Sequence, residues 1–246
     1  MRFPRILLLL CFVLSLVSVC SATAVSFNAS SAGFPSSGGF LPGDATTVNI
    51  GGVQVDGFTV TINVPTLSIA FTPAPLFGRN EADDKGLGVC SSGETCTVPG
   101  GGLSNELSNE AAQELIRLTL PSGDNWQSVA ISSLDHSERG LLIGDAQNGF
   151  AVICEFGATG NSGGPFSGCS QSGNSESPVF AIPANFASSQ HLYFVPYDWL
   201  NAGANKENGF LVEGVSVNTV PEPASMLLFG TGLAGLAGLL HRRRRS

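Results

Sequence analysis

Short apolar stretches whose hydrophobic residues occupy every second position constrain the fold of this chain more than any other feature. In residues 59–64 the apolar side chains alternate strictly with Thr and Asn, and in residues 211–217 they alternate in part. A period of two places alternate side chains on opposite faces of a β-strand. We expect strands at 46–50, 58–64, 67–71, 114–120, 128–132, 141–143, 150–156, 179–182, 191–195 and 210–217. Clusters of Gly, Ser, Asn and Pro separate them and indicate turns. The pattern therefore predicts an all-β fold, an antiparallel β-sandwich or jelly roll.

The predicted sandwich occupies residues 25–219. One short helix is expected within it, at 104–114, and the Gly/Ser-rich segment 157–178 is expected to be a long loop. The segment contains five Lys and Arg against eighteen Asp and Glu, an excess of thirteen negative charges. Such a surface repels a phosphate backbone, so nucleic acid is not an expected partner.

The N-terminal residues 1–24 have the pattern of a secretory signal peptide. Arg2 and Arg5 precede an apolar run at 6–19, and Ala22 and Ala24 form the small-x-small pattern that a signal peptidase requires. We expect cleavage before Val25 after export by the Sec machinery. The alternative is a lipoprotein signal with Cys20 as the modified residue, which the bulky Val19 before it disfavours.

The C-terminal residues 220–246 form three consecutive parts. Residues 220–225 contain Pro221, Glu222 and Pro223, residues 226–240 are an apolar run, and residues 241–246 are basic. The basic tail contains Arg242, Arg243, Arg244 and Arg245. A helix over 224–240 would be about 25 Å long, the short limit for a single transmembrane helix. The arginines are expected to stay in the cytoplasm, with the sandwich outside. An ordinary C-terminal membrane anchor is the alternative interpretation.

This order of a Pro-Glu-Pro triplet, a short Gly-rich apolar helix and an arginine cluster resembles the PEP-CTERM sorting signal. The resemblance implies an exosortase as partner, a membrane-embedded cysteine transpeptidase that removes the helix near Pro-Glu-Pro. The protein would then be anchored in the inner membrane before processing and lie at the cell surface or outside the cell afterwards. The resemblance also implies bacteria that make extracellular polysaccharide, hence a polysaccharide partner and a role in biofilm.

A second resemblance concerns the predicted sandwich. Residues 86–89 read Gly-Leu-Gly-Val, residues 105–110 form an Asn/Glu-rich turn, and residues 115–120 follow as an amphipathic strand. This succession resembles a pattern of PEP-CTERM proteins whose bodies are similar to galactose-binding-like jelly rolls. The usual turn contains more Asp than this one.

Four cysteines remain after removal of the signal peptide: Cys90, Cys96, Cys154 and Cys169. An even number in an exported chain indicates disulfides, and four cysteines allow three pairings. We expect local pairing, Cys90 with Cys96 and Cys154 with Cys169. The spacing does not match a zinc site.

No motif in the sequence defines a catalytic site. The string at 160–165 resembles the segment around the nucleophilic serine of trypsin-like proteases, which would make Ser162 the nucleophile. The only upstream histidine, His136, is 26 residues away, and in that family the base lies much farther upstream. We therefore expect a non-catalytic body.

Two binding functions stay open as hypotheses. No cofactor or metal is expected, and calcium is the open alternative, with Asp83, Asp84 and Glu106 as its candidate ligands. The aromatic residues that could form a sugar-binding platform are Trp126, Tyr193, Tyr197 and Trp199. The alternatives to a structural surface protein are thus a calcium-assisted carbohydrate-binding module and a secreted glycan hydrolase, the latter needing two carboxylates in one cleft.

Overall fold

The computed structural model describes residues 21–27, 38–41, 43–63, 68–81, 84–92, 96, 106–108, 112–134, 138–146, 149–157, 171–173, 177–197, 209–219 and 230–235. In this part of the chain, strands form two antiparallel sheets, and residues 230–235 form a short helix. The predicted all-β antiparallel sandwich is confirmed, whereas the galactose-binding-like jelly roll stays a prediction.

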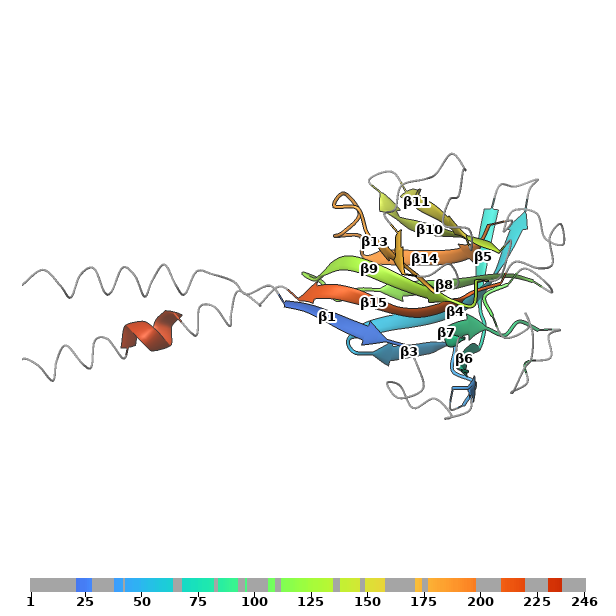
Figure 1. Ribbon diagram of the computed structural model, residues 1–246, viewed down its shortest axis with the longest axis horizontal. Coiled ribbons are helices and arrows are strands. Elements are labelled where there is room, and N and C mark those ends of the chain that lie inside the picture. The colour runs from blue at the N-terminus through green and yellow to red at the C-terminus, as the bar shows by residue number, and fades with distance from the viewer. Residues whose placement is uncertain are drawn as a thin grey trace, which may run out of the picture.

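The first sheet, sheet A, has eight strands in the order β12-β13-β9-β15-β7-β6-β2, with β1 also pairing β15. Its strands are β1 (Ser21–Ser26), β2 (Gly39–Phe40), β6 (Leu76–Asn80), β7 (Lys85–Val89), β9 (Asn125–Ser132), β12 (Gln171–Gly173), β13 (Pro178–Ala181) and β15 (Leu211–Thr219). Strand β15 lies in the middle of this sheet, and one of its edges pairs with β9. Its other edge is shared by β7 and β1 (Figure 1).

The second sheet, sheet B, has seven strands in the order β11-β10-β14-β8-β4-β3, with β5 also pairing β4. Its strands are β3 (Thr47–Ile50), β4 (Val53–Asn63), β5 (Ser68–Pro73), β8 (Gln113–Thr119), β10 (Arg139–Ala146), β11 (Gly149–Gly157) and β14 (His191–Pro196). The long strand β4 pairs first with β3 and then with β5 along one edge. The other edge of β4 pairs with β8.

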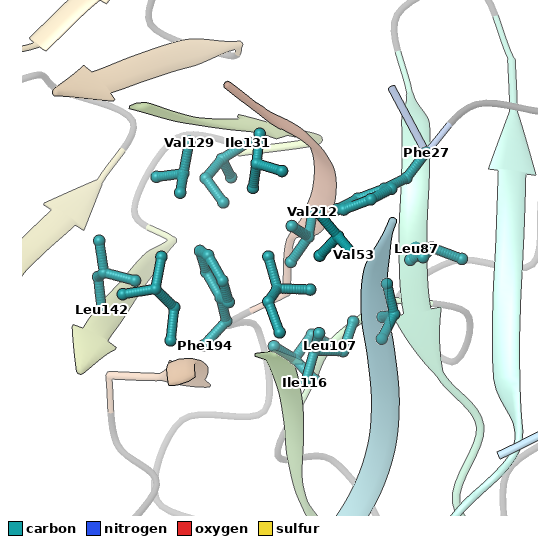
Figure 2. Packing of buried hydrophobic residues seen from close by; sticks show 14 of the residues in the cluster. Phe27, Val53, Leu87, Leu107, Ile116, Val129, Ile131, Leu142, Phe194 and Val212 are labelled. Atoms are coloured by element: carbon teal, nitrogen blue, oxygen red, sulfur yellow. The ribbon is translucent and has the colours of Figure 1, made fainter. Parts of the chain in front are cut away.

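The main hydrophobic core contains inward side chains of both sheets. Sheet B contributes Ile116, Leu142 and Phe194, and sheet A contributes Ile131 and Val212, all of them buried (Figure 2). In β8 the core residues Ile116 and Leu118 occupy alternate positions, and in β14 Leu192 and Phe194 do, as a face turned to a core requires. The partial alternation of residues 211–217 therefore corresponds to the space between the two sheets, which Val212, Val215 and Val217 line.

Each of the ten expected strands overlaps one observed strand, but other strands were not expected. Strands β6 and β7 are buried along almost their whole length, so their sequences lack alternation. In β7, the position of Gly86 requires a glycine. Its φ is +147°, and a Cβ there would lie 2.6 Å from the carbonyl oxygen of Val212 on the neighbouring β15.

The expected helix at 104–114 is wrong for the residues that the structure describes there. Gln113 and Glu114 begin β8, and residues 106–108 are not helical. Leu107 is buried, and its backbone N–H donates to the carbonyl oxygen of Phe210. Tertiary packing of this apolar side chain therefore overrides the helical propensity of the segment.

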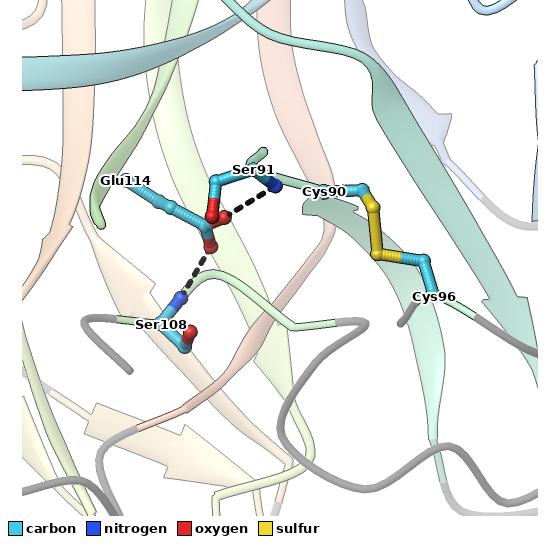
Figure 3. Close-up of a disulfide and its surroundings, with 5 residues drawn as sticks. All are labelled: Cys90, Ser91, Cys96, Ser108 and Glu114. Atoms are coloured by element: carbon cyan, nitrogen blue, oxygen red, sulfur yellow. Dashed lines mark hydrogen bonds between the residues drawn. A yellow bond between two sulfur atoms is a disulfide. The ribbon is translucent and has the colours of Figure 1, made fainter. Parts of the chain in front are cut away.

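The disulfide between Cys90 and Cys96 confirms the local pairing expected for these two cysteines (Figure 3). Beside it, the buried carboxylate of Glu114 accepts the backbone N–H of Ser91 at 3.0 Å and that of Ser108 at 2.8 Å. Two loops are thus fixed to the start of β8. Cys154 is also disulfide-bonded, but Cys169 lies outside the described residues, so its pairing with Cys154 stays a prediction.

Candidate functional site

The outer face of sheet B, turned away from the core, has an apolar cluster of its own. Along β14 the side chains of Leu192 and Phe194 enter the main core, while Tyr193 and Val195 belong to this second cluster. Its buried members are Val60, Leu115, Leu141, Ile143, Tyr193 and Val195. An antiparallel sheet commonly has one face on the core and one in water. An apolar outer face therefore needs an explanation beyond folding.

A groove of about 210 Å³ lies over this cluster, and we call it the sheet B groove. Its lining residues are Ile69 and Phe71 of β5, Leu115 of β8, Ile143 of β10, Phe150 and Val152 of β11, and Tyr193 and Val195 of β14. The exposed side chains are Ile69 and Phe71 of β5, 46% and 44% accessible, and Phe150 of β11, 61% accessible, whereas Val152 of β11 is half-buried. The groove therefore has a buried floor between two exposed apolar rims.

Aromatic contacts hold both rims in place. The ring of Phe150 meets that of Tyr193 edge to face with 5.0 Å between centroids, and Phe71 meets Phe58 in the same way at 5.9 Å. The guanidinium of Arg117 lies 5.0 Å from the centre of the Phe58 ring. Rings that neighbours already hold lose little conformational freedom when a ligand binds, so the rims are preorganised.

Beside the groove, Asp145 organises a polar group of side chains. Its Oδ2 atom accepts hydrogen bonds from the backbone N–H of His191 at 2.8 Å and lies 2.9 Å from His191 Nδ1. The Tyr193 hydroxyl donates to Oδ1 at 3.5 Å. Asp145 and His191 also line a wide hollow together with Asn185 and Ser188. Tyr193 contacts this lining through its hydrogen bond to Asp145. Among the described residues that line the hollow, Asp145 is the only carboxylate, whereas glycosidases need two.

Ionisation of Tyr193 should lower stability at alkaline pH. Its pKa is raised to about 12, mainly by burial and then by the negative charge of Asp145. The folded state therefore holds the phenolic proton more tightly than the unfolded chain, whose tyrosines have a pKa of about 10. This contribution to stability is complete below pH ~10 and is lost as the pH rises towards about 12.

Chemical denaturation of the wild type and of Tyr193→Phe tests this expectation at two pH values, pH 9 and a pH close to the raised pKa of about 12. The variant keeps the ring against Phe150 but has no phenolic proton, so its stability should fall less between the two pH values. Equal losses in both proteins would show that Tyr193 does not contribute to the pH dependence.

The structure distributes the aromatic candidates over quite different environments. Trp126 is fully buried and donates from Nε1 to the carbonyl oxygen of Ser189 at 2.7 Å, so this candidate does not form part of a surface platform. Tyr193 lines the groove, and Tyr197 stacks against the guanidinium of Arg139 at 3.9 Å. Trp199 lies outside the described residues. Phe71 and Phe150 were missed because phenylalanines are common in this chain and most of the described ones are buried.

The calcium candidates that the structure describes lie around an arginine. Asp84 Oδ2 is 2.8 Å from Arg79 Nη2, and Glu106 pairs with Nη1 of the same buried guanidinium. Glu106 also accepts a hydrogen bond from the Ser133 hydroxyl. Within the described ranges, no group of three or more His, Cys, Asp or Glu side chains is placed to hold a metal ion. Asp83 lies outside these ranges, and calcium binding stays a prediction.

Several other sequence candidates cannot be placed. His136, Ser162, the Pro221-Glu222-Pro223 triplet and Arg242 to Arg245 all lie outside the described residues. Of the expected transmembrane segment, residues 230–235 are described, and they are helical. No helix in the described part of the chain combines the length and the apolar character that a membrane span requires.

The last strand of the sandwich ends beside the first strand, next to the expected N-terminal cut. Strand β15 ends at Thr219, and its last residues pair with β1. The side chains of Ala22 and Ala24 are exposed, whereas Val25 is 6% exposed and Phe27 is fully buried. Burial of the N-terminal segment therefore begins at the residue where the mature chain is expected to begin. The expected N-terminal cut lies within β1, and β15, which pairs with β1, ends two residues before Pro221 in the sequence.

Comparison with known proteins identifies the segment that follows β15. A family model described as the PEP-CTERM protein-sorting motif matches residues 219–245. No curated protein matches the chain, and no solved structure matches it. The motif implies an exported protein that is anchored in the membrane before processing by an exosortase. Immediately after the last strand of its β-sandwich, this chain carries a PEP-CTERM protein-sorting motif.

Proposed function

We propose that this chain is a non-catalytic protein of the cell surface or extracellular matrix, exported by the Sec machinery and sorted through its PEP-CTERM signal. The observation that carries the proposal is the position of the motif, which starts at Thr219, the last residue of β15. The whole sandwich thus precedes the segment that an exosortase would remove. Cleavage near Pro221 would release the folded body without cutting any described strand.

The exposed alanines before Val25 support a signal peptide at the other end. A signal peptidase needs Ala22 and Ala24 in its active site. Neither alanine contributes buried surface to the sandwich. Removal of residues 1–24 would leave Val25 and Phe27 in the core.

Replacing Pro221, Glu222 and Pro223 by alanines should keep the protein in the inner membrane. The apolar run at 226–240 and the four terminal arginines remain, so the anchor persists while the site of processing is lost. Immunoblots of membrane and extracellular fractions from the native host measure the distribution. We expect at least a tenfold loss of extracellular protein relative to the wild type.

The matched control is the double variant Ser225→Ala/Thr231→Ala, which leaves the triplet, the apolar length and the arginines unchanged. It should be exported like the wild type. If the triple-alanine variant and the wild type are distributed equally, the C-terminal segment is not a processed sorting signal and the proposal fails.

The sheet B groove favours a second candidate function, recognition of sugar rings in the extracellular polysaccharide. Exposed Phe71 and Phe150 offer apolar faces, and Asp145, which lies opposite Phe150 in the β10–β11 pairing, offers with His191 hydrogen-bonding groups beside one rim of the groove. Sugar rings have apolar faces bordered by hydroxyls, which such a combination of groups fits. This candidate function differs from the calcium-assisted carbohydrate-binding module. The calcium candidates Asp84 and Glu106 pair with Arg79 and do not line the groove that carries the exposed aromatic rings.

Phe150→Ser should weaken binding to polysaccharide purified from the host about tenfold, or roughly 1.4 kcal/mol. Co-sedimentation or calorimetry of the two proteins measures the effect. Thr61→Ser is the matched control, since Thr61 is exposed on β4 and does not line the groove. Unchanged affinity of Phe150→Ser would exclude the groove as the sugar-binding site.

A further inference from the structure

The outer face of sheet B changes from apolar to charged at one end of the sheet B groove. Asp145 lies opposite Phe150 in the pairing of β10 with β11, so the two side chains point to the same face. Directly opposed residues of antiparallel strands have Cβ atoms about 4.5–5.5 Å apart. Ile143, two positions before Asp145 on β10, lines the groove. A carboxylate therefore stands beside an exposed aromatic ring where the apolar groove ends.

The Asp145 carboxylate keeps acceptor capacity on the side of the groove. Its Oδ2 atom accepts the backbone N–H of His191 at 2.8 Å and lies 2.9 Å from Nδ1 of the same residue. Among the described residues, Oδ1 has the Tyr193 hydroxyl as its one donor, at the long distance of 3.5 Å. A carboxylate oxygen has two lone pairs, and the Asp145 side chain is 32% exposed. Oδ1 can therefore accept a further hydrogen bond from a ligand.

The charge of Asp145 is not neutralised by an arginine or a lysine of the described chain. The other ion-paired carboxylates of sheet B each have an arginine, namely Asp56 with Arg117 and Glu155 with Arg139. Asp145 pairs with His191 instead, which is charged only when it is protonated. Burial and then the charge of Asp145 raise the pKa of Tyr193 to about 12. The negative charge therefore acts on a residue that lines the groove.

The charge of the whole body distinguishes between classes of saccharide. Residues 25–219 contain five Lys and Arg against eighteen Asp and Glu, which repels a chain that carries carboxylate, sulfate or phosphate groups. A neutral chain is not repelled, but it leaves the Asp145 charge without a counter-ion. A chain with ammonium groups supplies that counter-ion. The ring of Phe150, 61% exposed, also attracts a cation to its face.

We propose that the sheet B groove binds a polysaccharide of amino sugars with free amino groups, glucosamine being the simplest, and that Asp145 takes one of the ammonium groups. The ammonium group donates to Oδ1, and the sugar ring lies against Phe150. Neighbouring hydroxyls meet the polar side chains of the adjoining hollow, among them Asn185, Ser188 and Gln190. A lysine-rich peptide has the same charge, but its flexible side chains bring no rigid ring face to the aromatic rims. The inference rests on the second candidate function, sugar recognition by the groove, and names its substrate class.

Calorimetry of the exported protein with two oligosaccharides of equal length tests the inference at pH ~6, where an amine is protonated. One is an oligomer of glucosamine, and the other is the oligomer of N-acetylglucosamine, which has the same ring but no charge. We expect the wild type to bind the glucosamine oligomer at least tenfold more tightly, because a hydrogen bond to a charged group is among the strong ones. This comparison needs no variant, so it does not depend on how a variant folds.

Asp145→Asn should reduce the preference for the glucosamine oligomer to less than about twofold. The amide oxygen can still accept the backbone N–H of His191, so the contact between β10 and β14 is kept. Asp44→Asn is the matched control, since it removes the same charge from an exposed residue that lines neither the groove nor the hollow. Its φ of 50° is one that asparagine tolerates. This control should keep the preference of the wild type.

Equal affinity of the wild type for the two oligomers, or a preference that persists in Asp145→Asn, would overturn the inference. A lysine oligomer that competes with the glucosamine oligomer at equal affinity would overturn it too, because the site would then respond to charge alone. If neither oligosaccharide binds while Phe150→Ser still weakens binding of the host polysaccharide, amino sugars are excluded and the second candidate function stands. If Phe150→Ser binds the host polysaccharide like the wild type, the second candidate function itself fails.

Discussion

Replacing Trp126 by alanine should lower the free energy of unfolding by about 3–5 kcal/mol. The indole is fully buried in the core between the two sheets and is among the largest of the fully buried side chains. Its removal would leave a large cavity. It would also leave the carbonyl oxygen of Ser189 without the indole N–H that donates to it at 2.7 Å.

Urea unfolding of the purified exported protein measures this loss. Trp126→Phe should cost less than Trp126→Ala, because the phenyl ring fills part of the cavity, which leaves the lost hydrogen bond and a smaller void as its costs. Phe150→Ala serves as a control for an exposed aromatic, since Phe150 is 61% accessible and should change stability by less than about 1 kcal/mol. If Trp126→Ala and Phe150→Ala were equally stable, the assignment of Trp126 to the core would be wrong.

Arg79→Met should destabilise the protein by a comparable amount, about 3–5 kcal/mol. Arg79 and Glu106 are both buried, and the guanidinium also contacts Asp84. Removal of the arginine leaves the Glu106 carboxylate in a poorly solvated place without its cationic partner. The Ser133 hydroxyl that donates to Glu106 cannot replace that charge.

The double variant Arg79→Met/Glu106→Leu should be compared with Arg79→Met in the same unfolding experiment. Replacing both ends of a buried ion pair with apolar side chains of similar volume is often close to neutral. We therefore expect the double variant to regain most of the stability that Arg79→Met loses. If the double variant lost as much stability as Arg79→Met and Glu106→Leu lose together, the two side chains would not interact.

The alternating pattern of the sequence was sufficient to predict strands whose two faces differ. Strand β4 is an example, since residues 59–63 alternate within an eleven-residue strand. The pattern does not tell which face meets the core, because Val60 belongs to the outer cluster of sheet B whereas Val53 and Val55 enter the main core. The pattern fails where both faces are buried, as in β7, whose residues 86–89 are all buried. Such a sequence lacks the alternation by which a strand is recognised, so its pairing with β15 is set by tertiary packing.

Much less of the candidate site was predictable. The sequence offered Trp126 and Tyr193 as equivalent aromatic candidates, yet the first is in the core and the second lines the groove. Which face a residue occupies depends on the register of its strand, and a shift of one residue exchanges the two faces. The groove also needs β5 and β11, which pair with different strands of sheet B. Composition and spacing contain no signal for that long-range arrangement.

The disulfide between Cys90 and Cys96, in contrast to the groove, was predictable from the sequence. Cys90 and Cys96 are separated by six positions, and local pairing follows from that small spacing in an exported chain. The neighbouring role of Glu114 was not predictable, because it depends on backbone N–H groups from two separate loops. Acidic residues in this region looked like calcium ligands, but the described ones accept hydrogen bonds or pair with Arg79.

The intact mass of the protein recovered from outside the native host tests the central claim most directly. The account predicts a mature chain that begins at Val25, ends near Pro221 and has lost both the apolar run at 226–240 and the terminal arginines. Such a mass would establish that the sandwich is exported and trimmed at both ends. A full-length mass, or one that still includes residues 226–246, would contradict the account and identify the C-terminal segment as a permanent anchor.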